Sequence, residues 1–103
     1  MTGFVKVASM DNIPQGGKMK VEAKGKEILL TNVNGKIYAI DNICSHEDCG
    51  LDEGDLEGFV IICPCHGAKY DLRNGNGFKE TPWGSGQDTY NVKIEGKDVL
   101  VEI

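Results

Sequence analysis

Apolar and polar residues alternate repeatedly along the chain or form short apolar runs, and no stretch of useful length shows helical periodicity. Alternation with a period of two places neighbouring side chains on opposite faces, which is typical of strands with one buried face. The pattern predicts eight strands, at 4–8, 18–23, 27–33, 36–40, 59–62, 68–72, 89–94 and 98–103. We therefore expect an all-β protein whose two ends form strand meanders.

Glycine marks the turns between these strands. Asn34-Gly35, between the third and fourth segments, is the strongest short signal for a hairpin, because a type I′ turn needs two residues with positive φ. Lys24-Gly25 joins the second and third segments in a similar way. Gly96 lies between the last two segments, which are expected to form another hairpin.

The stretch from residue 43 to about residue 86 has a different character. It holds all four cysteines, both histidines and two of the three prolines, and outside its two short strands it is rich in Gly, Asp, Asn and Glu. A loop-rich insertion of this length is uncommon in a small domain unless it carries a function. We expect one domain, residues 1–103, in which a subdomain at about 43–86 is inserted into a basal β domain.

Composition and charge narrow the class of protein. The chain has 103 residues, 40% of them hydrophobic, which suits one globular domain. Its 11 basic and 16 acidic side chains argue against nucleic acid as a partner, because nucleic acid is bound through Lys and Arg. The sequence predicts no membrane span and no secretory signal, so we expect a cytoplasmic protein. Cysteines in that compartment indicate metal or redox chemistry before a disulfide scaffold.

Two short motifs form the candidate site. Cys44 and His46 make the first, Cys63 and His66 the second, and 16 residues separate His46 from Cys63. Each motif follows a predicted strand, so two loops can each present one thiolate and one imidazole to a common site. These ligands suit zinc or iron–sulfur, but zinc sites usually take both cysteines from one knuckle. A Cys-x-His pair divides more naturally between two metals, which favours a binuclear cluster.

This arrangement of C-x-H, sixteen residues and then C-P-C-H-G resembles the signature of Rieske proteins, and the resemblance covers essentially the whole chain. It implies a Rieske fold, an antiparallel β-sandwich base with a small loop-rich cluster-binding subdomain. It also implies one [2Fe-2S] cluster per chain, with Cys44 and Cys63 on one iron and His46 and His66 on the other.

The remaining two cysteines match a feature of the high-potential Rieske proteins. Those members carry a cysteine five residues after the first ligand and another between the second Cys and His, joined as a disulfide. Cys49 and Cys65 occupy these two places, so the resemblance implies a bridge between the ligand loops. The reducing cytosol opposes such a bond, and two reduced thiols are the alternative.

The resemblance also indicates which residues surround the cluster. Pro64 and Gly67 belong to the second motif and are expected to lie beside the cluster. High-potential members place a serine and a tyrosine in the following strand, hydrogen-bonded to sulfur. Tyr70 matches the tyrosine, with an ordinary core aromatic as the alternative, whereas Ala68 has no hydroxyl. Because such hydrogen bonds stabilise the added electron, losing one lowers the reduction potential.

Negative charge is concentrated around the motifs. Residues 37–68 include seven acidic residues and no Lys or Arg. A docking face for a basic partner would use this charge, with a merely solvated loop as the alternative. The candidates for docking are Glu47, Asp48, Asp52 and Glu53. A third loop containing Pro82 and Trp83 is a candidate to cover the cluster, or else to pack in the base.

Together these features favour a soluble, monomeric one-electron carrier without a catalytic centre of its own. It would pass electrons between a reductase and a terminal acceptor such as an oxygenase. One alternative is the small Rieske subunit of a larger redox enzyme, similar to nitrite reductase. An alternative of another class is a structural zinc-binding interaction module, which would not absorb visible light.

Overall fold

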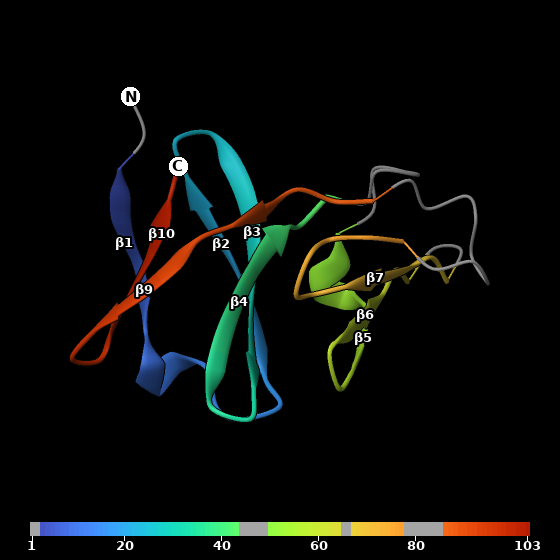
Figure 1. Ribbon diagram of the computed structural model, residues 1–103, viewed down its shortest axis with the longest axis horizontal. Coiled ribbons are helices and arrows are strands. Elements are labelled where there is room, and N and C mark those ends of the chain that lie inside the picture. Colours follow the sequence, from blue (N-terminus) through green and yellow to red (C-terminus); the bar gives the residue numbers. More distant parts are fainter. Residues whose placement is uncertain (1–2, 44–49, 65–66, 78–85) are drawn as a thin grey trace.

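The computed structural model describes residues 3–43, 50–64, 67–77 and 86–103, and these residues form three antiparallel sheets. The first sheet has the order β1 (Phe4–Ser9), β10 (Asp98–Glu102), β9 (Val92–Glu95). The second has the order β2 (Lys18–Ala23), β3 (Lys26–Val33), β4 (Lys36–Asp41), β8 (Thr89–Tyr90). These two sheets form the base, on the left of Figure 1.

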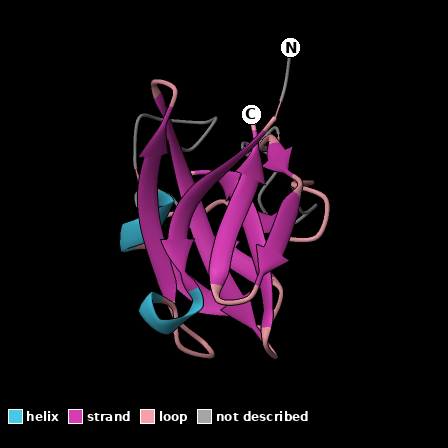
Figure 2. Cartoon of the chain, turned by 90° about the vertical axis from the view of Figure 1, so that its left-hand side faces the viewer, coloured by secondary structure: helices cyan, strands magenta, loops and turns pink. Residues whose placement is uncertain are grey.

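The third sheet is smaller and lies beside β4 at the other end of the molecule (Figure 1). It contains β5 (Asp55–Glu57), β6 (Val60–Ile62) and β7 (Lys69–Asp71), each of three residues. Two short 3₁₀ helices, η1 (Met10–Asn12) and η2 (Leu51–Glu53), complete the described elements. Seen from the side of the first sheet, strands make up nearly all of the base (Figure 2). The expected all-β, antiparallel fold is therefore confirmed.

The glycine-marked turns have the expected geometry. Asn34 and Gly35 have φ angles of 55° and 85°, and Val33 pairs with Lys36 across the turn. Because both central residues have positive φ, this is the turn conformation that follows the right-handed twist of the strands. The hairpin predicted from Asn34-Gly35 is confirmed, and it sets the register between β3 and β4.

Strand β3 is buried on both of its faces. Ile28 and Leu30 belong to the core between the two basal sheets, together with Val99 of β10. Leu29, on the opposite face, belongs to the core that includes Ile61 of the small sheet. Each fully buried side chain of this kind contributes about 1.5–3 kcal/mol. The strand therefore joins the base to the small sheet through packing rather than through hydrogen bonds.

The prediction of one strand over residues 89–94 was wrong. The chain breaks at Asn91: β8 pairs with β4 in the second sheet, and β9 pairs with β10 in the first. The segment thus crosses between the two basal sheets, a tertiary feature that alternation along the chain does not encode. Strand β5 was not predicted, because Asp-Leu-Glu is too short and too polar to show a pattern.

The described part of the chain has no helix that is both long enough and apolar enough to cross a membrane.

Candidate metal centre

The second motif begins where β6 ends. Cys63 follows this strand directly, and its side chain is 1% exposed. Its backbone N–H donates to the carbonyl of Ala68 at 2.7 Å, and its carbonyl accepts from the N–H of Gly67 at 3.0 Å. Gly67 has a φ of 73°, a conformation that favours glycine. The hairpin loop between β6 and β7 is therefore closed at its base, with a buried thiol at its first position.

The two residues expected to adjust the potential lie in the same apolar core as this thiol. Ala68 and Tyr70 are fully buried and share one cluster with Cys63 and Leu51. Tyr70 pairs with Ile61 across the β6–β7 ladder, so the small sheet holds its ring in place. Pro64 is exposed and Gly67 is half-buried. Ala68 and Tyr70 thus lie in the same buried cluster as Cys63, whereas Pro64 lies at the surface.

The first motif follows a strand end that is held by a buried asparagine. Asn42 is 1% exposed, its Nδ2 donates to Oδ1 of Asp52 and its Oδ1 accepts from the N–H of Asp52, both at 2.9 Å. Its carbonyl also accepts from the N–H of Leu51 at 2.7 Å. Ile43 forms an isolated bridge with Gly50. The chain therefore leaves at residue 43 and returns at residue 50 through a narrow, hydrogen-bonded neck.

Two glycines of this region have no room for a side chain, and one of them, Gly54, lies against the backbone that leads to the second motif. A side chain at Gly50 would overlap the Asp52 carboxylate, and one at Gly54 would overlap the carbonyl of Ile62, which immediately precedes Cys63. Glycine is required at such points because a Cβ atom has no room. Leu51 also lies in the same core as Cys63. The exit of the first loop and the start of the second are thus packed together.

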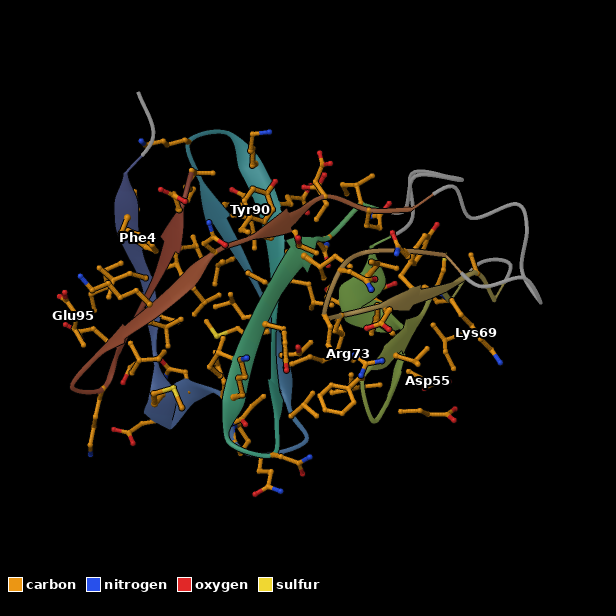
Figure 3. All side chains as sticks on the ribbon, viewed as in Figure 1. Phe4, Asp55, Lys69, Arg73, Tyr90 and Glu95 are labelled. Carbon is orange, nitrogen blue, oxygen red and sulfur yellow. The ribbon has the colours of Figure 1, made fainter. Side chains whose placement is uncertain are left out.

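The acidic candidates differ in their surroundings. Asp52 is half-buried, its carboxylate is engaged by Asn42, and its carbonyl accepts from Lys18 Nζ at 2.5 Å. Glu53 is exposed in the same 3₁₀ helix, and Asp55 is exposed on the neighbouring strand (Figure 3). Asp52 therefore has a structural contact within the chain, whereas Glu53 presents its charge to solvent.

A polar side chain that the sequence did not single out, Gln87, lies just before β8. Its Nε2 donates to the carbonyls of Asp41 at 3.0 Å and Ile43 at 2.6 Å. Nearby, the hydroxyl of Tyr90 donates to Oδ1 of Asp41 at 2.8 Å. Burial of the phenol and this bond to a carboxylate both raise the pKa of Tyr90. No motif or periodicity marks Gln87, because its role depends on a contact 44 residues away in sequence.

A charged pair supports the turn after β7. Arg73 Nε and Nη2 donate to the two carboxylate oxygens of Asp71 at 3.0 and 2.9 Å. The hydrogen bonds from Arg73 lower the pKa of Asp71, and the hydrogen bond to the Asp71 carboxylate raises the pKa of Arg73. The guanidinium also lies 4.7 Å from the ring centroid of Phe59, which meets Tyr38 of the base edge-on at 5.9 Å. This series of contacts connects the small sheet to β4.

Nine of the predicted site residues lie outside the part of the chain that the structure describes: Cys44, His46, Glu47, Asp48, Cys49, Cys65, His66, Pro82 and Trp83. Among the described residues there is no group of three or more potential metal ligands. Cys63 is the predicted ligand that is described, and a buried thiolate in an apolar surrounding is a suitable donor for iron–sulfur. The donor chemistry of the described part therefore fits the group that the motifs predict.

Comparison with known proteins gives a consistent result. The profile of the Rieske [2Fe-2S] domain family matches residues 3–91. The ferredoxin component of the naphthalene 1,2-dioxygenase/salicylate 5-hydroxylase systems of Ralstonia sp is 39% identical, over 97% of this chain and 95% of that protein.

Solved structures agree with the sequence match. The ferredoxin of carbazole 1,9a-dioxygenase from Nocardioides aromaticivorans IC177 superimposes with a TM-score of 0.89 at 30% identity, covering 95% of each chain. A second similar chain comes from a complex of reduced oxygenase and oxidised ferredoxin in carbazole 1,9a-dioxygenase. Its TM-score is 0.87 at 26% identity, over 95% of this chain and 91% of that one.

Proposed function

Because the chain belongs to the family of Rieske [2Fe-2S] domains, we propose that it is the ferredoxin of a multicomponent oxygenase system, carrying electrons from a reductase to a terminal oxygenase. The observation that carries the proposal is its 39% identity, over nearly the full length of both proteins, to a ferredoxin component of such systems. A ferredoxin of similar fold is seen in complex with its oxygenase. The predicted resemblance, the [2Fe-2S] cofactor and the electron-transfer role are confirmed by these relatives.

For this chain we propose the ligand set that the motifs indicate, with Cys44 and Cys63 on one iron and His46 and His66 on the other. Bound there, the cluster supplies a one-electron redox couple. Two neutral imidazoles in place of two thiolates make the site less negative, so an added electron meets less repulsion than in a four-cysteine site. The packed core around Cys63 keeps water from the sulfur, and the two closed loop bases hold the ligand segments in register.

Three finer assignments belong to the same proposal. Cys49 and Cys65 form a disulfide between the two ligand loops, as their positions in the motif suggest. Residues of about 43–86 act as the cluster-binding part of a single domain, since the small sheet and both loop bases fall within this stretch. The protein works as a monomer in the cytoplasm, the compartment expected from its sequence.

The acidic surface beside the small sheet is the proposed docking face. Glu53, Asp55 and Glu57 are exposed on consecutive elements, η2 and β5. Exposed charge of one sign steers a partner of opposite charge and raises its rate of association. We assign docking to these exposed carboxylates, together with Glu47 and Asp48 of the first loop, rather than to Asp52.

Cross-complementation tests the proposed function. A naphthalene dioxygenase reductase and oxygenase, mixed without their own ferredoxin, are supplied with the purified holoprotein and NADH. Product formation that depends on this chain is expected. A holoprotein that the reductase reduces but that delivers no electrons to any ferredoxin-dependent oxygenase would favour the alternative of a subunit of another redox enzyme. A colourless, zinc-loaded protein would overturn both.

A further inference from the structure

We infer that Gln87 is a positioning residue for the cluster, because its side chain holds the strand end from which Cys44 follows. This inference rests on the proposed ligand set. The amide Nε2 of Gln87 donates to the carbonyls of Asp41 and Ile43, at 3.0 and 2.6 Å. Two donors of one amide group therefore fix two peptide units that are two residues apart.

The side chain continues the sheet where its backbone pairing stops. Strands β4 and β8 pair at Ala39–Tyr90 and Ile40–Thr89, and the last backbone bond runs from the N–H of Asp41 to the carbonyl of Asp88 at 2.8 Å. Beyond this point β4 has no strand partner on that side within the described residues. The Gln87 amide takes the place of the missing partner, since it supplies donors to the carbonyls that a continued ladder would have bonded.

Gln87 is itself held from a third direction. Its backbone N–H donates to the carbonyl of Gly75 at 2.7 Å, in the turn that follows β7. Gly75 has a φ of 78°, and a side chain there would overlap the carbonyl of Gln87. The residue thus joins three segments: the end of β4, the turn after β7, and the approach to β8. A contact that ties both ligand-bearing regions together restricts the geometry of the site between them.

The role requires glutamine in particular. Asparagine is one methylene shorter, and glutamate of similar size offers carboxylate oxygens to two carbonyls that need donors. Methionine has a similar unbranched length without any donor. Gln87→Met and Gln87→Glu therefore remove the two hydrogen bonds while changing the volume little. Gln87 contains no ligand atom for the cluster, so its effect must pass through the backbone that it holds.

The test compares wild-type holoprotein with these two variants and with Gln15→Met, which changes an exposed glutamine of the base. We measure the rate of cluster bleaching by an excess of iron chelator, the EPR g-values after dithionite reduction, and the urea midpoint by far-UV circular dichroism. Because two hydrogen bonds are lost, we expect the cluster to bleach about tenfold faster in both Gln87 variants. Their EPR signals should be broadened or their g-values shifted. Gln15→Met should match the wild type.

Each result bears on one conclusion. Bleaching rates and g-values equal to those of the wild type, or a lowered urea midpoint alone, would overturn the positioning role, because a purely structural residue changes only the midpoint. If Gln87→Met does not fold, Gln87→Glu decides by the same criteria. A wild-type protein without a Rieske EPR signal would instead contradict the proposed ligand set, so the two failures are distinguishable.

Discussion

The interactions that hold the base differ from those that fix the segments around the small sheet. The base has strands of up to eight residues and an aliphatic core shared by its two sheets. The small sheet has strands of three residues and its own apolar core, and polar contacts fix the segments around it: Arg73 with Asp71 after β7, Asn42 with Asp52 at the neck, and Gln87 with the end of β4. Figure 3 shows the two ends, with Asp55 and Arg73 on the small sheet and Phe4 and Glu95 far from it. Hydrophobic burial gives stability without direction, whereas hydrogen bonds fix positions, which a redox site needs.

The largest effect is expected at the ligand itself. Cys63→Ser replaces the buried thiolate with a poor ligand for iron, so normal cluster assembly should be lost completely. The base should remain folded, because Cys63 lies outside its aliphatic core. Visible absorbance and EPR report the cluster, and far-UV circular dichroism reports the sheets. A variant with an intact Rieske spectrum would contradict the ligand assignment.

The roles of the two apolar cores can be distinguished by substituting one buried leucine in each. Leu30→Ala should destabilise the whole fold by about 2–5 kcal/mol in urea unfolding, because it leaves a cavity between the basal sheets. Its EPR g-values should stay unchanged. Leu51→Ala removes a fully buried side chain from the core that contains Cys63, and should also speed cluster bleaching. Equal bleaching rates in the two variants would show that both cores affect the stability of the cluster to the same extent.

A smaller effect is expected at the neck of the first loop. Asp52→Ala leaves the Nδ2 donor of buried Asn42 without its carboxylate acceptor, while the bond from the backbone N–H of residue 52 remains; the loss costs about 1–3 kcal/mol and should loosen the cluster. Glu53→Ala is the control from the same 3₁₀ helix, where the side chain is exposed. It should leave bleaching unchanged but weaken the salt dependence of electron transfer to the oxygenase. The reverse outcome would make Asp52 the docking residue and Glu53 the structural one.

A substitution at Ala68, the buried alanine next to the second motif, is expected to change the reduction potential. We expect a wild-type reduction potential in the lower half of the range of about −150 to +300 mV known for Rieske centres. Ala68→Ser should raise it by about 50 mV, if the added hydroxyl donates to a cluster sulfur. Ala39→Ser, at a buried alanine of the base, is the control and should leave the potential unchanged. Redox titration monitored by circular dichroism measures both, and a lower potential in Ala68→Ser would contradict the expectation.

The smallest expected effect is on the stability of the fold in acid. Asp71 has a pKa below its usual value because Arg73 hydrogen-bonds its carboxylate, so the pair stabilises the fold above the unfolded pKa of about 3.9. This stabilisation is lost as the pH falls through the lower folded value. The difference in urea midpoint between wild type and Asp71→Asn should therefore be present at neutral pH and shrink in acid. A difference in urea midpoint that stays constant from neutral pH into acid would contradict this expectation.

The sequence alone determined the class of fold and the chemistry of the site. Alternation located most of the strands, and Asn34-Gly35 predicted its turn because few residues accept positive φ. The Cys and His spacing indicated a Rieske cluster because ligand chemistry restricts both residue type and loop length. These signals are local, so they can be recognised without knowing which segments meet.

Only the tertiary structure decided how the segments meet. It divided residues 89–94 between two sheets, buried β3 on both faces, and gave Asp52 a partner inside the chain although its sequence position suggested an exposed carboxylate. It also brought Gln87 to the end of β4, 44 residues away from Ile43 in sequence. Such contacts depend on the packing of distant segments, and a polar side chain is not marked in the sequence by the backbone group that it will bind.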